Sequence, residues 1–171
     1  MFNNNSILLM NTTYLELGSN KGNRLLNISK AFVYLNQEIG EITNHSAIYE
    51  TDPWGFKSSD KFINIAVELK TNLQPHDLLN RIKEFEKKMG RKKITDKYES
   101  REIDIDIIFF NNNIINDNEL IIPHPRLHKR KFVLETLFDI IPDYIHPLLN
   151  KNIKQLYTEC NDKCNVEVYD Y

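Results

Sequence analysis

The alternation of strand-like and helix-like segments is the feature that most restricts how this chain can fold. Apolar–polar alternation with β-branched and aromatic residues predicts strands at 12–17, 41–50, 62–69 and 101–110. Apolar residues three and four apart predict helices at 24–37 and 75–89, which end near Gly40 and Gly90. The predicted order is therefore strand, helix, strand, strand, helix, strand.

This order is typical of the ferredoxin-like fold of the α/β (α+β) class, an antiparallel sheet with helices packed on one face. Later segments predict additional C-terminal helices at 131–141 and around 153–157, and a last strand around 166–169. The length of 171 residues favours one domain. We expect residues 1–11 to be a disordered tail and residues 12–171 to form a single domain.

Composition and charge exclude several classes of partner. The formal net charge of −2 argues against binding to bulk nucleic acid or to an anionic membrane. No apolar run approaches the ~20 residues that a membrane helix needs, and the amino terminus lacks the positive flank of a signal peptide. Cys160 and Cys164 have no second pair nearby, so we expect reduced thiols in a cytoplasmic protein.

Two carboxylates lie inside the apolar strand predicted at 101–110, which reads REIDIDIIFF. Residues i and i+2 of a strand share a face, so Asp104 and Asp106 project together, with Glu102 on their side. Ile105 and the isoleucines on either side of the pair face the other way, under the helices. Because one face of an antiparallel sheet is often open to water, the plain interpretation is a row of solvated charges.

The surrounding cations favour a metal and phosphate site instead. Two neighbouring like charges are better explained by a cation between them, and Mg²⁺ accepts one or two carboxylates together with water and phosphate oxygens. Cationic side chains flank the pair on both sides: Arg91, Lys92, Lys93, Lys97, Arg101, Arg126, His128, Lys129, Arg130 and Lys131. The stretch GSNKGNR does not match the phosphate-binding loop pattern, so side chains and metal would have to hold a nucleotide.

Several segments together resemble the 6-hydroxymethyl-7,8-dihydropterin pyrophosphokinase family. They are LELGSNKGNR at 15–24, SAIYETDPWG at 46–55, FINIAVEL at 62–69, FEKKMGR at 85–91, SREIDIDIIFF at 100–110 and PHPRLHKRKFVLETLFDIIPD at 123–143. The resemblance extends from about Thr13 to Leu156. Each segment alone is a weak signal, whereas the set in this order is highly specific.

The resemblance implies a ferredoxin-like fold and transfer of a pyrophosphoryl group from ATP to the pterin hydroxymethyl group, giving AMP. It implies that Asp104 and Asp106 hold two Mg²⁺ ions and that Arg91 and Arg101 are catalytic. The implied ATP-binding residues are Lys83, Glu86, Lys93, Tyr98, Ile107, His124 and Arg130. The implied pterin-binding residues are Thr51, Asp52, Trp54, Phe62, Asn64 and Phe132. Aromatic faces suit a flat pterin, and an Asn side chain can both donate to and accept from its amide edge.

The chain departs from the family pattern in one loop. The family often has an RWGPR segment where this chain has Tyr98, Glu99 and Ser100 before Arg101, and Lys93 and Lys97 stand where Arg is frequent. Arg and Lys are not interchangeable at bidentate phosphate contacts, so those contacts would be weaker.

Two other functions fit the same predicted topology: a non-catalytic small-molecule-binding module and an RNA-binding sheet. The first does not require the paired aspartates with arginines, and the second requires a basic surface with exposed mid-strand aromatics. We therefore expect small-molecule substrates, no nucleic acid, no membrane and no obligate protein partner.

Overall fold

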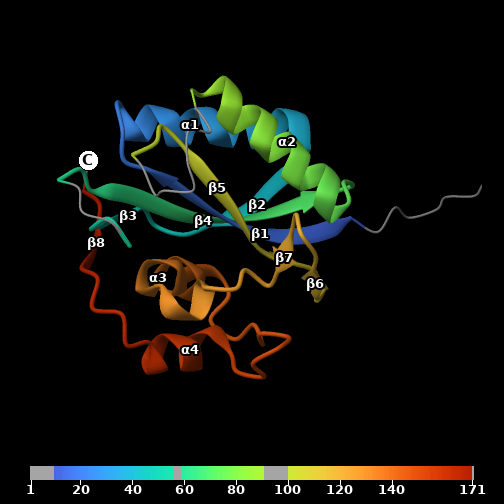
Figure 1. The fold of residues 1–171 in the computed structure, drawn as a ribbon, viewed down its shortest axis with the longest axis vertical. Coiled ribbons are helices and arrows are strands. Elements are labelled where there is room, and N and C mark those ends of the chain that lie inside the picture. The colour runs from blue at the N-terminus through green and yellow to red at the C-terminus, as the bar shows by residue number, and fades with distance from the viewer. Residues whose placement is uncertain (1–9, 56–58, 91–99, 171) are drawn as a thin grey trace, which may run out of the picture.

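The protein is a three-layer structure in which one antiparallel sheet lies between two pairs of helices (Figure 1). The computed structural model describes residues 10–55, 59–90 and 100–170. Helices α1 (Arg24–Tyr34) and α2 (Pro75–Lys88) cover one face, and α3 (Lys131–Ile140) and α4 (Ile153–Glu159) cover the other (Figure 1). In this described part, no helix combines the length and the apolar character that crossing a membrane requires.

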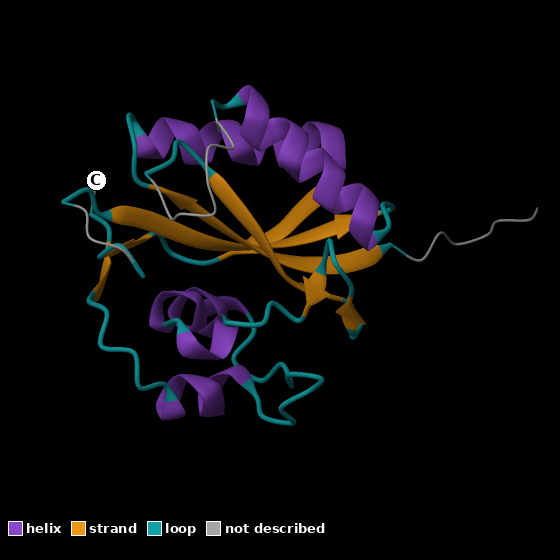
Figure 2. Cartoon of the chain, viewed as in Figure 1, coloured by secondary structure: helices purple, strands orange, loops and turns teal. Residues whose placement is uncertain are grey.

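The main sheet has the strand order β5-β1-β4-β3-β8, and β2 also pairs with β4. Its strands are β1 (Asn11–Ser19), β2 (Glu41–His45), β3 (Tyr49–Thr51), β4 (Phe62–Thr71), β5 (Asp104–Phe110) and β8 (Val166–Val168) (Figure 2). A separate small hairpin pairs β6 (Ile115–Asn116) with β7 (Ile121–Ile122), and a 3₁₀ turn spans Leu127–Lys129. The predicted tail at 1–11 lies outside the described residues except for its last two, and Asn11 begins β1.

Strand alternation sends the side chains of β1 into two different cores. Leu15 and Leu17 pack with α1 and α2 in one apolar cluster, which also contains Ile105 of β5. Tyr14 packs in a second cluster with residues of α3, including Leu137. The prediction that Ile103, Ile105 and Ile107 pack under helices is confirmed, since all three lie in the cluster with α1 and α2. The prediction that the opposite face is open is wrong, because α3 and α4 pack there.

The strand predicted at 41–50 is two strands, β2 and β3, that pair with successive parts of β4. At the break, the Ser46 hydroxyl accepts a hydrogen bond from the Ala66 backbone N–H at 3.0 Å, and the Ser46 N–H donates to the Ala66 carbonyl at 3.0 Å. A side chain thus replaces one backbone group of the ladder where the chain leaves the sheet. A serine hydroxyl can replace a backbone group in this way. The replacement leaves the apolar–polar alternation of the sequence almost unchanged, so the alternation does not reveal it.

The strand predicted at 101–110 begins only at Asp104, because the end of β1 holds the residues before it. Asn20 Oδ1 accepts the Arg101 N–H at 2.8 Å, and Ser19 Oγ donates to the Glu102 carbonyl at 2.5 Å. Glu102 is therefore not aligned with the aspartates as predicted, and its carboxylate pairs with Lys21 at 2.9 Å.

The first predicted helix is α-helical only to Tyr34 and continues as a wider π turn over Leu35–Ile39. The chain then turns at Gly40 onto β2. A Cβ atom at Gly40 would lie 2.0 Å from the Lys70 carbonyl oxygen of β4. Glycine is required there because helix end and strand backbone approach closely, and the sequence had marked it as the end of this helix.

Candidate active site

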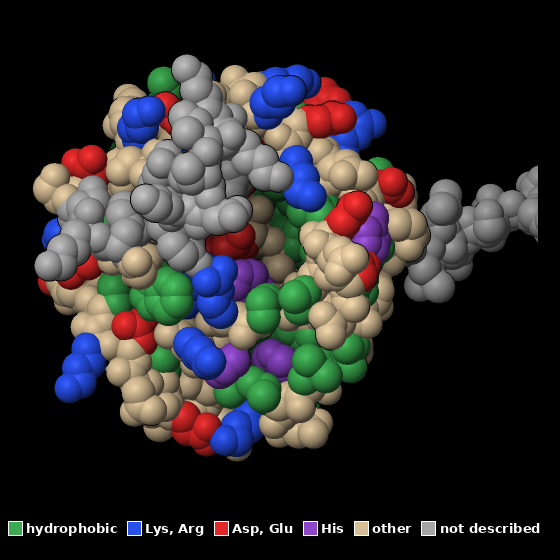
Figure 3. All heavy atoms as spheres, viewed as in Figure 1, with side chains coloured by type: hydrophobic (Ala, Val, Ile, Leu, Met, Phe, Trp, Pro, Cys, Tyr) green, Lys and Arg blue, Asp and Glu red, His purple; other side chains and the backbone are tan. Residues whose placement is uncertain are grey.

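One cavity opens on the α3 side of the sheet and collects residues from the first strand to the third helix. Its lining comprises Glu16, Gly18, Thr51, Asp52, Trp54, Phe62, Asn64, Arg101, Asp104, Asp106, Arg130 and Phe132. In the space-filling view, acidic, histidine and Lys or Arg side chains gather around a hollow near the centre of the visible side of the molecule (Figure 3). All six predicted pterin residues and both predicted metal ligands therefore border one space.

Two aspartates of β5 form the acidic wall of the cavity. The antiparallel register places Asp104 beside Gly18 of β1 and Asp106 beside Glu16. Each carboxylate has its own arginine: Arg101 Nη1 lies 2.8 Å from Asp104 Oδ2, and Arg130 Nη1 lies 3.2 Å from Asp106 Oδ2. The predicted association of the aspartate pair with nearby cations therefore occurs, through one arginine just before β5 and one just before α3.

The electrostatics of this wall favour a bound cation. Burial and the neighbouring Asp104 charge raise the pKa of Asp106 to about 6, against the opposing effect of Arg130. A divalent ion would relieve this repulsion. Within the described ranges no group of three or more His, Cys, Asp or Glu side chains could hold a metal. Two carboxylates facing an open cavity nevertheless fit Mg²⁺, which takes its remaining ligands from water and phosphate.

His124 lies at the edge of the same wall, with Nε2 3.8 Å from Asp106 Oδ2. Burial and the charges of Arg130 and Arg126 lower the pKa of His124 to about 4, so the ring is neutral near pH 7 and the contact is not an ion pair. His124 Nδ1 accepts the Arg126 backbone N–H at 3.2 Å. The proton of the neutral ring is consequently on Nε2, which faces the carboxylate.

Two aromatic residues, Phe62 of β4 and Phe132 of α3, line the cavity together with the buried polar residues Asn64 and Thr51. We call this part of the cavity the slot. Asn64 Nδ2 donates to Thr51 Oγ1 at 2.7 Å, which fixes the orientation of the Asn64 amide. A Cβ atom at Gly18 would be 3.1 Å from Asn64 Oδ1. Glycine thus leaves space directly in front of this oxygen.

Arg130 connects the slot with the acidic wall. Its guanidinium carbon lies 4.8 Å from the centre of the Trp54 ring and 5.8 Å from that of Phe132. Stacking on aromatic faces suits the planar guanidinium. Its side chain is only 7% exposed, so an otherwise costly buried charge is compensated by Asp106 and by two rings.

The other predicted ATP residues are not all in the cavity. Lys83 is exposed on α2, and Ile107 is packed in the core under α1 and α2. Glu86 is 3% exposed, and its Oε1 accepts the Ile105 backbone N–H at 2.9 Å, which ties α2 to β5. The predicted residues Arg91, Lys93 and Tyr98 lie outside the described residues.

Sequence reasoning missed two residues of the lining, Glu16 and Gly18. The first strand predicted from the sequence ends at residue 17, whereas Gly18 lies inside β1. A glycine within a strand often marks the close approach of a ligand or another backbone, and this signal was present. Glu16 is one polar position of an alternating strand, and nothing local in the sequence indicates that it is buried.

Comparison with known proteins gives a consistent result. A family model described as 7,8-dihydro-6-hydroxymethylpterin-pyrophosphokinase (HPPK) matches residues 14–142. The chain is 43% identical over 150 residues to 2-amino-4-hydroxy-6-hydroxymethyldihydropteridine pyrophosphokinase of Aquifex aeolicus, covering 88% of this chain and 92% of that protein. It is 40% identical over 131 residues to the Bacillus subtilis protein of the same name, covering 76% of this chain and 78% of that protein.

Longer proteins also contain a matching region. The folic acid synthesis protein FOL1 of Dictyostelium discoideum is 44% identical over 147 residues, which cover 86% of this chain but 22% of that protein. A crystal structure of wild-type Plasmodium falciparum HPPK-DHPS has the same fold, with a TM-score of 0.72 at 22% identity, covering 87% of this chain and 44% of that one. Because the family model matches most of its length, and these relatives align with at least three quarters of it, the chain belongs to the 7,8-dihydro-6-hydroxymethylpterin pyrophosphokinase family.

Proposed function

We propose that the protein transfers a pyrophosphoryl group from ATP to the hydroxymethyl group of 6-hydroxymethyl-7,8-dihydropterin, in folate biosynthesis. The products are AMP and the pterin diphosphate. Membership of the family and the names of its relatives support this activity. The observation that carries it in this chain is the meeting of an acid pair, two arginines and an aromatic slot in one cavity.

In the reaction, the hydroxymethyl oxygen forms a bond to the β-phosphorus, and the bond from that phosphorus to the bridging oxygen of the α-phosphate breaks. AMP leaves with the electron pair, and the hydroxyl proton is released. Such transfers depend mainly on positioning and on stabilising the charge of the phosphoryl group. The chain therefore has to align two substrates and supply cationic donors between them.

Asp104 and Asp106 would hold Mg²⁺, two ions being expected, and bound Mg²⁺ would neutralise charge on the triphosphate. Arg101 supplies N–H donors at the same wall, since its Nη1 already lies 2.8 Å from Asp104. Arg130 supplies a second guanidinium between this wall and the slot. Both arginines are suited to phosphate oxygens, which they can bind through two parallel hydrogen bonds.

The slot would bind the pterin ring between Phe62 and Phe132. Asn64 Oδ1, with the space left by Gly18 before it, is an acceptor for an N–H of the pterin amide edge. Thr51 holds this amide through its hydroxyl. The ring would then extend from Asn64 across β1 toward Asp104, which places its hydroxymethyl group at the acidic wall.

For the nucleotide, we propose His124 and Arg130 next to Asp106, and Lys83, Glu86, Lys93, Tyr98, Ile107 and Arg91 from the family resemblance. We also propose that the sheet is the ferredoxin-like arrangement. The strand order β5-β1-β4, with β2 and β3 on the far side of β4, supports this topology.

The decisive experiment is product analysis with ATP, Mg²⁺ and the dihydropterin. AMP and the pterin diphosphate are expected in equal amounts, and only when both substrates are present. Formation of ADP would indicate transfer of a single phosphoryl group and would contradict the proposal. Tight binding of both compounds without AMP formation would favour a binding module.

A further inference from the structure

Two buried polar atoms beside the cavity, Glu16 Oε1 and Arg130 Nε, have no hydrogen-bond partner among the described residues. Glu16 is 4% exposed and Arg130 6%. Buried donors and acceptors are normally paired, and each exception calls for an explanation. One of these atoms is an acceptor and the other a donor, so each is a chemically suitable partner for the other.

Strand register brings the two side chains into one neighbourhood. Glu16 of β1 is paired directly with Asp106 of β5, and Arg130 Nη1 donates to Asp106 Oδ2 at 3.2 Å. The charge of Arg130 also acts on the Glu16 carboxyl, where it opposes the larger rise in pKa that burial causes. Glu16 and Asp106 are therefore neighbouring carboxyl groups beside the guanidinium of Arg130. In this structure the guanidinium is hydrogen-bonded to Asp106.

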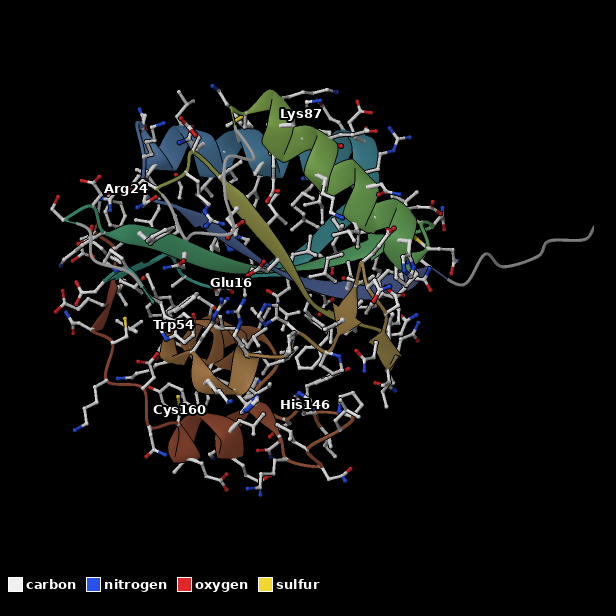
Figure 4. All side chains as sticks on the ribbon, in the orientation of Figure 1. Glu16, Arg24, Trp54, Lys87, His146 and Cys160 are labelled. Atoms are coloured by element: carbon white, nitrogen blue, oxygen red, sulfur yellow. The ribbon has the colours of Figure 1, made fainter. Side chains whose placement is uncertain are left out.

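A contact with α3 holds Glu16 in place. Its Oε2 accepts a hydrogen bond from Thr136 Oγ1 at 2.7 Å, and Thr136 is fully buried. Figure 4 shows Glu16 between the sheet and α3, on the same side of the sheet as Trp54. Because Thr136 engages one oxygen, the carboxyl cannot turn freely, and Oε1 stays available.

We propose that Glu16 is a positioning residue that accepts the Arg130 guanidinium when Asp106 takes a divalent ion. This inference rests on the metal role proposed above for Asp106. A cation on Asp106 repels a guanidinium a few ångströms away. Glu16 Oε1 then accepts the Arg130 Nε–H, which keeps the guanidinium between Trp54 and the acids instead of releasing it to water.

The first test measures metal binding without turnover. Mn²⁺ binding is followed by electron paramagnetic resonance in the presence of a non-hydrolysable ATP analogue. Glu16→Ala should weaken Mn²⁺ binding about tenfold, because Arg130 then stays on Asp106 and competes with the ion. Glu16→Gln keeps an oxygen acceptor without the charge and should stay within about twofold of the wild type. A Gln variant as weak as the Ala variant would show that only the negative charge matters and would overturn the proposal.

A double-mutant cycle tests whether Glu16 acts on metal binding through Arg130 or through a general disturbance of the fold. In an Arg130→Met background, which keeps an unbranched stem against Trp54, the Glu16→Ala change should have no further effect on Mn²⁺ affinity. Thr13→Val is the matched control, since it removes another buried side-chain hydrogen bond of β1 outside the cavity. If Glu16→Ala lowers the Mn²⁺ affinity equally in the wild-type and Arg130→Met backgrounds, the proposal is contradicted.

The Arg130 Nε–H can also be observed directly. In ¹⁵N spectra, Mg²⁺ with the ATP analogue should shift the Arg130 Nε–H resonance in the wild type and in Glu16→Gln, but not in Glu16→Ala. This measurement needs only the Gln variant and the wild type if the Ala variant fails to fold. Absence of Mn²⁺ binding to the wild type would refute the metal role itself, whereas binding without a shift at Arg130 refutes the exchange alone.

Discussion

At the residue scale, the chemistry of the site comes from a few positions whose side chains share one face of adjacent strands. Asp104 and Asp106 are two residues apart on β5, and Gly18 and Glu16 lie beside them on β1. The residue types differ in what they contribute: two provide carboxylates at the cavity wall, one provides space, and one provides a buried carboxyl. Substitution at each position therefore predicts a different experimental signature.

The acid pair should control turnover without controlling folding. Asp104→Asn and Asp106→Asn each keep the side-chain shape but remove the charge that would hold Mg²⁺, so kcat should fall at least ~100-fold. AMP release measures the loss, and circular dichroism should show an unchanged fold. The exposed Asp143→Asn variant, outside the cavity, is the control. Full activity in either cavity variant would refute the metal role.

Gly18 should control the affinity for the acceptor. The methyl group of Gly18→Ala would stand 3.1 Å from Asn64 Oδ1 and 3.6 Å from the Phe62 ring, inside the slot. We expect KM for the pterin to rise about tenfold, equivalent to about 1.4 kcal/mol, while KM for ATP changes less than about twofold. Steady-state kinetics with each substrate varied in turn measures both. An unchanged pterin KM would place the ring elsewhere.

At the scale of elements, α3 combines two tasks, since it covers the second face of the sheet and begins at the cavity. Its buried side packs against β4, and its start carries Arg130 and Phe132. The segment that leads from α3 to α4 is anchored by His146, whose Nδ1 accepts the N–H groups of Leu148 and Leu149, each at 3.2 Å. The position of this layer thus depends on a buried imidazole.

This anchor predicts a pH dependence of stability. Burial and the charge of His128 lower the pKa of His146 below its ordinary 6.5. The unfolded chain binds this proton more readily, so the stabilisation is present above pH 6.5 and is lost as the pH falls toward the lower folded value. Between pH 7 and pH 5, the unfolding free energy of His146→Asn should fall less than that of the wild type. Urea unfolding at both pH values tests this, and equal losses would contradict it.

At the scale of the whole molecule, the site exists only where separate parts of the chain meet. Its residues come from β1, β3, β4, β5 and α3 and from the segments that adjoin β3, β5 and α3, and the last strand, β8, pairs with β3. That pairing places Val166 opposite Thr51, the residue that holds the Asn64 amide. The C-terminal strand therefore supports the slot proposed for the pterin, although it contributes no residue to the lining.

Removal of the last strand should consequently weaken the slot. A chain that ends at Glu159 leaves β3 at the edge of the sheet, so the melting temperature should fall and KM for the pterin should rise by about threefold or more. KM for ATP should change little, because the acid pair on β5 lies at the opposite edge. Val168→Ala, which trims an exposed side chain but keeps the pairing, is the control. If the truncated chain has an unchanged KM for the pterin, β8 does not support the slot.

The sequence by itself determined the order of the elements and the common face of Asp104 and Asp106, because strand and helix periodicities are local properties. Through family resemblance it also implied six residues for a pterin pocket, and all six line one cavity. Local patterns could not show that Ser46 would divide a predicted strand, since one side-chain hydrogen bond replaces a backbone group there.

Only the tertiary structure decided which partners the functional side chains have. Among the described residues it paired Arg101 with Asp104 and Arg130 with Asp106, covered the second face of the sheet with α3, and buried Glu16 beside Asp106. These outcomes depend on strand register and on the packing of segments up to 120 residues apart, as in the contact of Thr136 with Glu16. No short-range sequence pattern encodes contacts between segments so far apart, because these contacts form only when whole faces of the sheet are buried together.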